Sequence, residues 1–391
     1  MDVLRQLPVL RQHFPGVRFI QIDEGYQRCL REGARAMIDL VYDGVEPFDP
    51  VKFPSGAKGT ADKIKAAGYR PALWLGLWAS LASRMMQEHP DWVLRDEAGR
   101  PLIFDKWYGG TCVLDLSVPE AREYLERLCH TVFQEWGYEG VKLDFSTFAF
   151  EAKRIRYRHG ARTALEWKQW LVETFRRYLP VDGFFGWCVV GGTGSPFAGG
   201  AADYFRAALD IGRGRWEMAP QIAAWMANTN MLLQDRPVLP NIDSLGVSAH
   251  LTPVEQQTWL DLGAISGAAL EISGDLTKHP PAALAQLNRA LELSDPDRRV
   301  RCLDVPAGAF ALPPALWLAE GQADSLLALF NWSDAEATLS LPARFHGRAA
   351  TDVNTNETQA LGADQRLPAH GSRLLRLKEF RCAQGIVLPA T

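Results

Sequence analysis

The 391-residue chain contains 47% hydrophobic and 23% charged residues, a balance typical of a folded globular protein, which excludes a chain that is disordered throughout. Its formal net charge is -4 and no run of Lys and Arg is interleaved with aromatic residues, so nothing indicates a nucleic-acid groove. No stretch of about 18 uninterrupted apolar residues predicts a membrane span. We therefore expect a small, neutral partner, with neither nucleic acid nor membrane.

The six cysteines are scattered along the chain, with no C-x-x-C pair and no histidine at the spacing of a metal ligand. This pattern predicts reduced thiols, no metal and no cofactor. The N-terminal segment 1–7 lacks the apolar core of a secretion signal, and we therefore expect a cytoplasmic protein. The oligomeric state is left open, a homo-oligomer included.

Short apolar segments alternate with longer amphipathic stretches over residues 1–297, which is the pattern of repeated βα units around a parallel sheet. The predicted strands span 17–22, 70–77, 139–145, 183–190, 203–209, 236–241 and 268–273. A capping box at Ser117–Glu120 and an apolar stripe from Trp167 to Tyr178 predict two of the connecting helices. Seven strands are one fewer than a (β/α)8-type barrel needs, so we predict an α/β fold with such a barrel, in which the first strand is missing.

After residue 298 the pattern changes to short alternating runs, such as 326–330 and 372–377, which are broken by Gly, Pro, Asn and Asp. Alternation of this kind is typical of antiparallel strands. We therefore predict a catalytic barrel over residues 1–297 and a small C-terminal antiparallel β-sandwich domain over residues 298–391.

Two of the predicted strands end in an aspartate, Asp144 and Asp210. Because residues two apart in a strand point to the same side, Lys142 projects with Asp144 and Arg206 projects with Asp210. In a parallel barrel both pairs would point into the interior at the carboxyl ends of the strands, where such barrels carry their active sites. Paired carboxylates indicate a glycosidase. From spacing alone, buried ion pairs that brace the strand ends are an equally good interpretation.

Thirteen tryptophans are a high count for this length, and aromatic faces are what proteins use to stack on sugar rings. Trp74 and Trp78 lie on the same side of one predicted strand end. They are candidate walls for a sugar, and core packing is the alternative interpretation.

Several segments resemble motifs of glycoside hydrolase family 36, the melibiase-type α-galactosidases of clan D, and they occur in the family's order. These segments are Phe19–Tyr26 (Q-I-D-D in the family), Gly68–Trp74 (G-x-x-x-G-x-W), Glu88–Val93 (E-H-P-D-W-V), Val113–Ser117 (x-L-D-L-S), Val141–Phe145 (x-K-I-D-F), Gly194–Pro196 (G-S-P), Arg206–Asp210 (R-x-x-x-D), Asn241–Asp243 (D-P-D) and Ala369–Ser372. Together they cover nearly the whole chain.

The resemblance implies a retaining α-galactosidase that removes terminal galactosyl residues from short oligosaccharides by double displacement. It implies that Asp144 is the nucleophile and Asp210 the general acid/base, with their carboxyl groups about 5–5.5 Å apart. The chemistry agrees, because Lys142 would favour the ionised form of the nucleophile, whereas the acid must keep its proton in drier surroundings.

The resemblance also implies a set of substrate-binding residues: Asp23, Glu24, Trp74, Trp78, Lys142, Arg206 and Asp243. Asp23 has a second interpretation, as a cap of the following helix. Glu24 stands where the family has Asp, and one extra methylene shifts a carboxylate by about an ångström, enough to change which hydroxyl it holds. The preference for galactose over another α-sugar is therefore open.

The chain also lacks the family's N-terminal β-sandwich and the first barrel strand with its C-S-W end. Three explanations are open: a true start upstream, a natural truncation completed by a partner, or a decayed relative. The alternative functions are a non-catalytic sugar-binding protein, and a clan relative that acts on another α-glycoside or as a transglycosylase.

Overall fold

The computed structural model describes most of the chain, in two compact units. The described residues are 3–31, 34–35, 41–42, 44, 46–103, 110–144, 155–160, 162–188, 202–208, 210–211, 215–233, 238–246, 248, 250–304 and 313–378. The first unit is Met1–Arg206 and the second is Ala207–Thr391. The predicted division into a barrel of residues 1–297 and a β domain of residues 298–391 stays a prediction.

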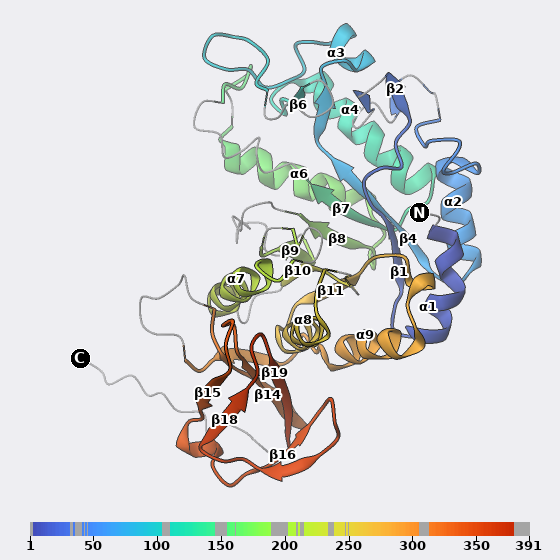
Figure 1. Ribbon diagram of the computed structural model, residues 1–391. Helices are drawn as coiled ribbons and strands as arrows, with labels where there is room; N and C mark the ends of the chain where they lie inside the picture. Colours follow the sequence, from blue (N-terminus) through green and yellow to red (C-terminus); the bar gives the residue numbers. More distant parts are fainter. Residues whose placement is uncertain are drawn as a thin grey trace. The chain divides into compact units, whose positions relative to one another are not determined.

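A seven-stranded sheet with the strand order β1-β4-β7-β8-β9-β10-β11 is the scaffold of the fold (Figure 1). Its strands are β1 (Phe19–Ile22), β4 (Arg70–Gly76), β7 (Gly140–Asp144), β8 (Phe184–Trp187), β9 (Tyr204–Arg206), β10 (Leu239–Leu245) and β11 (Ala269–Ile272). The strand pairs whose register is described run parallel. The prediction of a curled, barrel-type sheet with seven strands is confirmed, and β1 and β11 are the end strands of its order.

The helical elements described in the first unit precede its strands or connect them. They are η1 (Val3–Gln6), α1 (Leu7–His13), α2 (Gly56–Ala66), α3 (Arg84–Glu88), α4 (Pro119–His130), the π-helical turn η4 (Thr131–Glu135) and α6 (Ala164–Tyr178). A capping box between Thr163 and Glu166 begins α6. Trp167, Leu171 and Phe175 recur every four residues on its buried face, so the predicted stripe packs into the core.

The capping box predicted at Ser117 is wrong. Helix α4 begins at Pro119, its N-cap residue is Val118, and no side chain that the structure describes caps it. Ser117 instead accepts a hydrogen bond at Oγ from the backbone amide of His159, at 2.9 Å. Because Pro119 suits the first helical position, the helix starts one residue later than the S-x-x-E pattern indicates.

Two short two-stranded sheets of the first unit were not predicted. They are formed by β2 (Cys29–Arg31) with β3 (Ala34–Arg35), and by β5 (Trp78–Ser80) with β6 (Thr111–Val113). Strands of two or three residues carry too little alternation to be recognised in a sequence.

The described part of the second unit contains further helices and the antiparallel strands. The helical elements are α7 (Met218–Leu233), α8 (Pro253–Ile265), η6 (Leu276–Lys278), α9 (Pro281–Leu293) and η7 (Ala343–Phe345). A six-stranded sheet has the order β12-β13-β14-β19-β16-β17, and β15 pairs with β18. The strands are β12 (Arg299–Cys302), β13 (Leu316–Glu320), β14 (Asp324–Phe330), β15 (Ala337–Ser340), β16 (Ala349–Asp352), β17 (Thr358–Ala360), β18 (Asp364–Leu367) and β19 (Ser372–Lys378). Leucines from several of these strands pack around Phe345, which confirms the predicted antiparallel β fold.

Helix α8 is fastened to this antiparallel β fold by Glu255, Thr258 and Asp261, which recur every three residues on the helix. Thr258 donates a hydrogen bond from Oγ1 to the carbonyl oxygen of His370 at 2.6 Å. Ser372 donates from Oγ to Oδ2 of Asp261 at 2.7 Å. Burial raises the pKa of Asp261 to about 6, although its hydrogen bonds act in the opposite direction.

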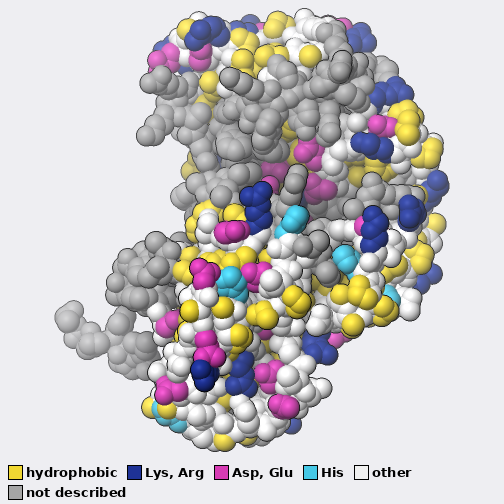
Figure 2. Space-filling model, in the orientation of Figure 1, with side chains coloured by type: hydrophobic (Ala, Val, Ile, Leu, Met, Phe, Trp, Pro, Cys, Tyr) yellow, Lys and Arg dark blue, Asp and Glu magenta, His cyan; other side chains and the backbone are white. Residues whose placement is uncertain are grey.

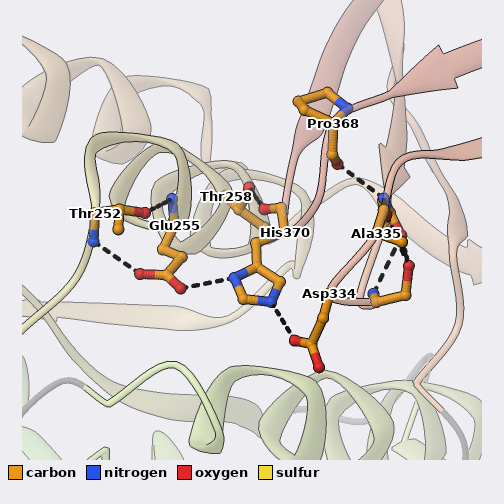
Figure 3. A network of polar contacts seen from close by, with 9 residues as sticks. Thr252, Glu255, Thr258, Asp334, Ala335, Pro368 and His370 are labelled. Atoms are coloured by element: carbon orange, nitrogen blue, oxygen red, sulfur yellow. Dashed lines mark hydrogen bonds and ion pairs between the residues drawn. The ribbon is translucent and has the colours of Figure 1, made fainter.

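The imidazole of His370 lies between two carboxylates (Figure 3), with Nδ1 2.7 Å from Oε1 of Glu255 and Nε2 2.8 Å from Oδ1 of Asp334. The ring also stacks on Trp216, with centroids 4.4 Å apart. Burial alone lowers the pKa of His370, but the contacts with Asp334 and Glu255 outweigh it and raise the pKa. Burial likewise raises the pKa of Glu255, and the hydrogen bonds from Thr252 and His370 bring it below its usual value.

Charged side chains of both signs are interspersed over the face drawn in Figure 2, in keeping with the small net charge of -4. Within the described residues, no helix has the length and apolar content needed to cross a membrane. Within the described part of the chain, Cys112, Cys129, Cys188 and Cys302 are not in disulfide bonds. Among the residues that the structure describes, no cluster of three or more His, Cys, Asp or Glu has the arrangement of a metal site.

Candidate active site

The carboxyl ends of β1, β4 and β7 bring four of the predicted site residues of the first unit together: Asp23, Trp74, Lys142 and Asp144. Asp23 directly follows β1, and Asp144 is the last residue of β7. The register places Trp74 opposite Lys142. Because the carboxyl ends of parallel strands meet at one edge of a sheet, residues distant in sequence share this edge.

The carboxylate of Asp144 is held by a tryptophan. Trp74 donates a hydrogen bond from Nε1 to Oδ2 of Asp144 at 3.1 Å. Both side chains are buried, with 2% of Trp74 and 8% of Asp144 exposed, so water competes little for this contact. A hydrogen bond from a neutral donor to a buried carboxylate favours the ionised form, which a nucleophile requires.

Asp23 and Lys142 form an ion pair beside this carboxylate, with Lys142 Nζ 2.9 Å from Asp23 Oδ2. Gln21 Nε2 donates to the same oxygen at 2.8 Å, and the amide of Glu24 donates to Oδ1 at 2.8 Å. Burial alone raises the pKa of Asp23. The charge of Lys142 and the hydrogen bonds from Lys142, Glu24 and Gln21 outweigh burial, so the pKa lies below its usual value. The lysine side chain is buried while half of the carboxylate side chain, 51%, is exposed, which leaves an ionised group accessible at the strand ends.

Gly76 makes room for the indoles of Trp74 and Trp78 at the end of β4. A Cβ atom on Gly76 would lie 2.6 Å from Cδ1 of Trp78 and 3.3 Å from Cη2 of Trp74. Both tryptophans are buried, and Gly76 lies opposite Asp144 in the register. The close approach therefore requires glycine at this position.

Tyr26 is a supporting residue that the sequence analysis did not single out. Its hydroxyl donates a hydrogen bond to the carbonyl oxygen of Trp74 at 3.1 Å. Burial, together with the charges of nearby groups including Asp23 and Glu24, raises the pKa of Tyr26 well above its usual value, so the hydroxyl keeps its proton. Its position in the Q-I-D-E-G-Y segment was the available signal, but its partner depends on the packing of β4.

Three further predicted site residues lie at the end of β9, after β9 and in β10. Arg206 is the last residue of β9 and is almost fully buried. Because β9 ends there, alternation along a strand does not determine the direction of Asp210, whose side chain is exposed. In the second unit, the backbone amide of Ile211 donates to Oδ2 of Asp243 at 2.8 Å. Asp144 and Asp210 belong to different units, and the separation of their carboxyl groups stays a prediction.

The E-H-P-D-W-V segment contributes to a separate cavity of about 410 Å³. The lining residues are Val41, Tyr42, Arg84, Glu88, His89, Trp92, Tyr124 and Arg127. His89 and Trp92 stack with centroids 4.0 Å apart, and Tyr42 donates to Glu88 at 2.7 Å. This cavity holds none of the predicted site residues. The Gly194–Pro196 segment, which resembles the family's G-S-P motif, lies outside the described residues.

No family model matches the chain. Solved structures, however, share its fold at low sequence identity. A GH27 β-L-arabinopyranosidase from Geobacillus stearothermophilus, in complex with arabinose, is 15% identical, and the match covers 97% of this chain and 94% of that chain with a TM-score of 0.75. The α-galactosidase I of Mortierella vinacea is 15% identical over 96% of this chain and 91% of its own, with a TM-score of 0.64. The α-galactosidase of Thermus thermophilus, bound to p-nitrophenyl α-D-galactopyranoside, is 22% identical over 81% of this chain and 60% of its own, with a TM-score of 0.58.

The chain therefore has a GH27-like fold, a barrel-type sheet followed by an antiparallel β fold. The structural similarity does not distinguish family 36, whose motifs the sequence resembles, from family 27.

Proposed function

We propose that this protein is a retaining glycoside hydrolase that removes terminal α-galactosyl residues from short oligosaccharides. The observation that carries the proposal is the buried carboxylate of Asp144, which accepts a hydrogen bond from Trp74 beside the Asp23–Lys142 ion pair. A carboxylate at the carboxyl end of a barrel strand is suited to attack an anomeric carbon.

In the proposed reaction, a carboxylate oxygen of Asp144 forms a bond to the anomeric carbon while the bond to the leaving oxygen breaks. Asp210 gives its proton to that oxygen. Water then attacks the glycosyl-enzyme, Asp210 takes a proton from the water, and Asp144 is released, so the configuration is retained. This requires the two carboxyl groups to lie about 5–5.5 Å apart.

The Asp23–Lys142 pair is proposed to hold sugar hydroxyls, since it offers a charged acceptor and a charged donor at the strand ends. Glu24, next to it, is exposed and would contact the same sugar. A β-L-arabinopyranoside is the second candidate substrate, because one of the similar structures acts on it and its ring matches that of α-galactose without the C6 group.

The first test is hydrolysis of p-nitrophenyl α-D-galactopyranoside and of the β-L-arabinopyranoside by wild type, Asp144→Ala and Asp62→Asn. Asp62 is an exposed carboxylate paired with Lys58, and its variant is the matched control. We expect release by wild type and Asp62→Asn and almost none by Asp144→Ala. A folded wild type that releases nothing from either substrate would contradict the proposal and favour a non-catalytic sugar-binding protein.

Azide separates the roles of the two carboxylates. In Asp144→Gly, azide can attack the anomeric carbon directly, and the expected product is β-galactosyl azide. In Asp210→Gly, azide can attack the glycosyl-enzyme formed on Asp144, and the expected product is α-galactosyl azide. The same anomer from both variants would contradict the assignment.

A further inference from the structure

Strand β10 contains a β-bulge immediately beside the proposed acid/base. In its pairing with β11, Asn241 lies opposite Ala269 but Ser244 lies opposite Glu271, so β10 holds one extra residue between the two pairs. Within this bulge Asp243 has a φ of 74°, in the left-handed region that residues other than glycine rarely adopt. Bulges and such strained backbones occur preferentially at functional sites, where they redirect a side chain.

The redirected side chain contacts the chain next to Asp210. Oδ2 of Asp243 accepts a hydrogen bond from the amide of Ile211 at 2.8 Å. The amide of Ala207 donates to the carbonyl oxygen of Asn241 at 2.9 Å. Asp210 therefore lies between two backbone amides that are both anchored on the bulged part of β10.

The bulge is itself braced from β11. Asn241 accepts a hydrogen bond at Oδ1 from the amide of Asp243 at 3.0 Å. Its Nδ2 donates to the carbonyl oxygen of Ala269 at 2.9 Å and to Oε1 of Glu271 at 3.2 Å. Because Asn241 is fully buried, these bonds fix the turn that directs Asp243 toward Ile211.

We propose that Asp243 is a positioning residue for the general acid/base, which fixes the backbone that carries Asp210. The inference rests on the proposed function and assigns Asp243 a role other than contact with the sugar. A carboxylate that accepts from a backbone amide makes a strong, directional bond. The acid must deliver its proton to one oxygen atom, and a displacement of about 1 Å can lower a rate on the order of 10²-fold.

Two substitutions separate the carboxylate from the backbone conformation. Asp243→Gly keeps the left-handed φ at no steric cost and removes the acceptor. Asp243→Asn keeps both an acceptor oxygen and a residue type that tolerates this φ. Asn356→Gly is the matched control, because Asn356 also has a positive φ, 61°, and lies in a turn of the antiparallel β fold.

The leaving group distinguishes positioning of the acid from binding of the sugar. Methyl α-galactoside needs a proton on its leaving oxygen, whereas 2,4-dinitrophenolate departs without one. For Asp243→Gly we expect kcat/KM to fall on the order of 10²-fold with the methyl galactoside and to stay near wild type with the dinitrophenyl galactoside. Asp243→Asn should restore most of the loss, and Asn356→Gly should behave as wild type with both.

Equal losses with the two substrates, accompanied by a higher KM, would overturn this inference and favour a sugar-binding role for Asp243. Hydrogen exchange of the peptide that contains Ile211 gives a readout independent of activity: protection should fall in Asp243→Gly and persist in Asp243→Asn. Unchanged protection in Asp243→Gly would overturn the anchoring. A wild type that cleaves neither galactoside contradicts the proposed function, whereas the two results above contradict this inference alone.

Discussion

The indole nitrogen of Trp74 and the carboxylate of Asp144 are joined by a 3.1 Å hydrogen bond between the neighbouring strands β4 and β7. In the register Trp74 lies opposite Lys142, two residues before Asp144, so its side chain reaches diagonally along the sheet. The proposed nucleophile is thus oriented by an adjacent strand, and Tyr26 holds the backbone of that strand in turn.

Trp74→Phe should lower kcat/KM between about tenfold and a hundredfold, because a hydrogen bond to a charged group is worth roughly 1.5–3 kcal/mol. Phenylalanine keeps most of the aromatic packing and removes the donor. Steady-state kinetics with the nitrophenyl galactoside measure the effect. Trp317→Phe is the matched control, since Trp317 is equally buried and donates from Nε1 to the carbonyl oxygen of Pro314 at 3.0 Å. Equal activity of the two variants would contradict the role of Trp74.

Lys142→Met should weaken sugar binding and reduce the loss of folding stability at acidic pH. The pKa of Asp23 lies below its usual 3.8 in the folded protein, so the ion pair stabilises the fold above that value and ceases to do so as the pH falls through the lowered pKa. Without Lys142, we expect a higher KM and a smaller loss of stability on acidification, by a modest amount because Asp23 is half exposed.

The matched control is Lys58→Met, which breaks an exposed ion pair of the same length, 2.9 Å, with Asp62. Melting temperatures between about pH 2.5 and pH 7 and the KM for the nitrophenyl galactoside make the comparison. A KM that is unchanged in Lys142→Met would contradict a role of this pair in holding the sugar.

Gly76→Ala should destabilise the protein by about 1–3 kcal/mol, the usual cost of forcing an extra methyl group into a packed site. The new Cβ would press on Cδ1 of Trp78 and Cη2 of Trp74, and activity should fall with the displacement of these rings. Denaturant unfolding and kinetics measure both effects. Gly160→Ala is the control, because a Cβ there meets no atom of the described residues within 4 Å. Equal stability of the two variants would contradict the packing requirement.

His370→Asn should flatten the dependence of stability on pH above neutrality. The pKa of His370 is raised in the fold, so its contribution is fully present below the unfolded value of about 6.5 and is lost as the pH rises through the folded pKa. Asparagine tolerates the positive φ of 58° at this position and does not titrate. Melting temperatures from pH 6 to about pH 9 should fall more in wild type than in His370→Asn. Parallel curves would contradict a raised pKa of His370 in the folded protein.

The strands of the parallel sheet could be predicted because buried parallel strands are short, nearly continuous apolar runs. For example, all five residues of β7 are buried, and its sequence reads as a strand without help from its neighbours. The proximity of Asp23 to Lys142 could also be anticipated, since both follow from the meeting of carboxyl ends at one edge of the sheet.

Contacts that depend on register or on local backbone irregularity could not be predicted. The bond from Trp74 to Asp144 depends on how β4 and β7 are aligned, which neither segment specifies alone. The left-handed turn at Asp243 interrupts a segment that otherwise reads as an ordinary strand, and only the pairing with β11 reveals the extra residue. The direction of Asp210 could not be derived from strand alternation for a related reason, because β9 ends four residues earlier.

The hydrogen bonds between helix α8 and the antiparallel strands determine where the protein can be truncated. A protein truncated after α9 would leave the carboxyl groups of Glu255 and Asp261 without their partners His370 and Ser372. It would also expose one face of helix α8, most of whose residues are buried in the intact chain. We expect such a fragment to aggregate. The newly exposed apolar face of α8 would be in contact with water, and the two carboxyl groups on it would have lost their hydrogen-bond partners. The C-terminal strands therefore cannot be removed without exposing helix α8. A search for the smallest active version of this protein should begin with them retained.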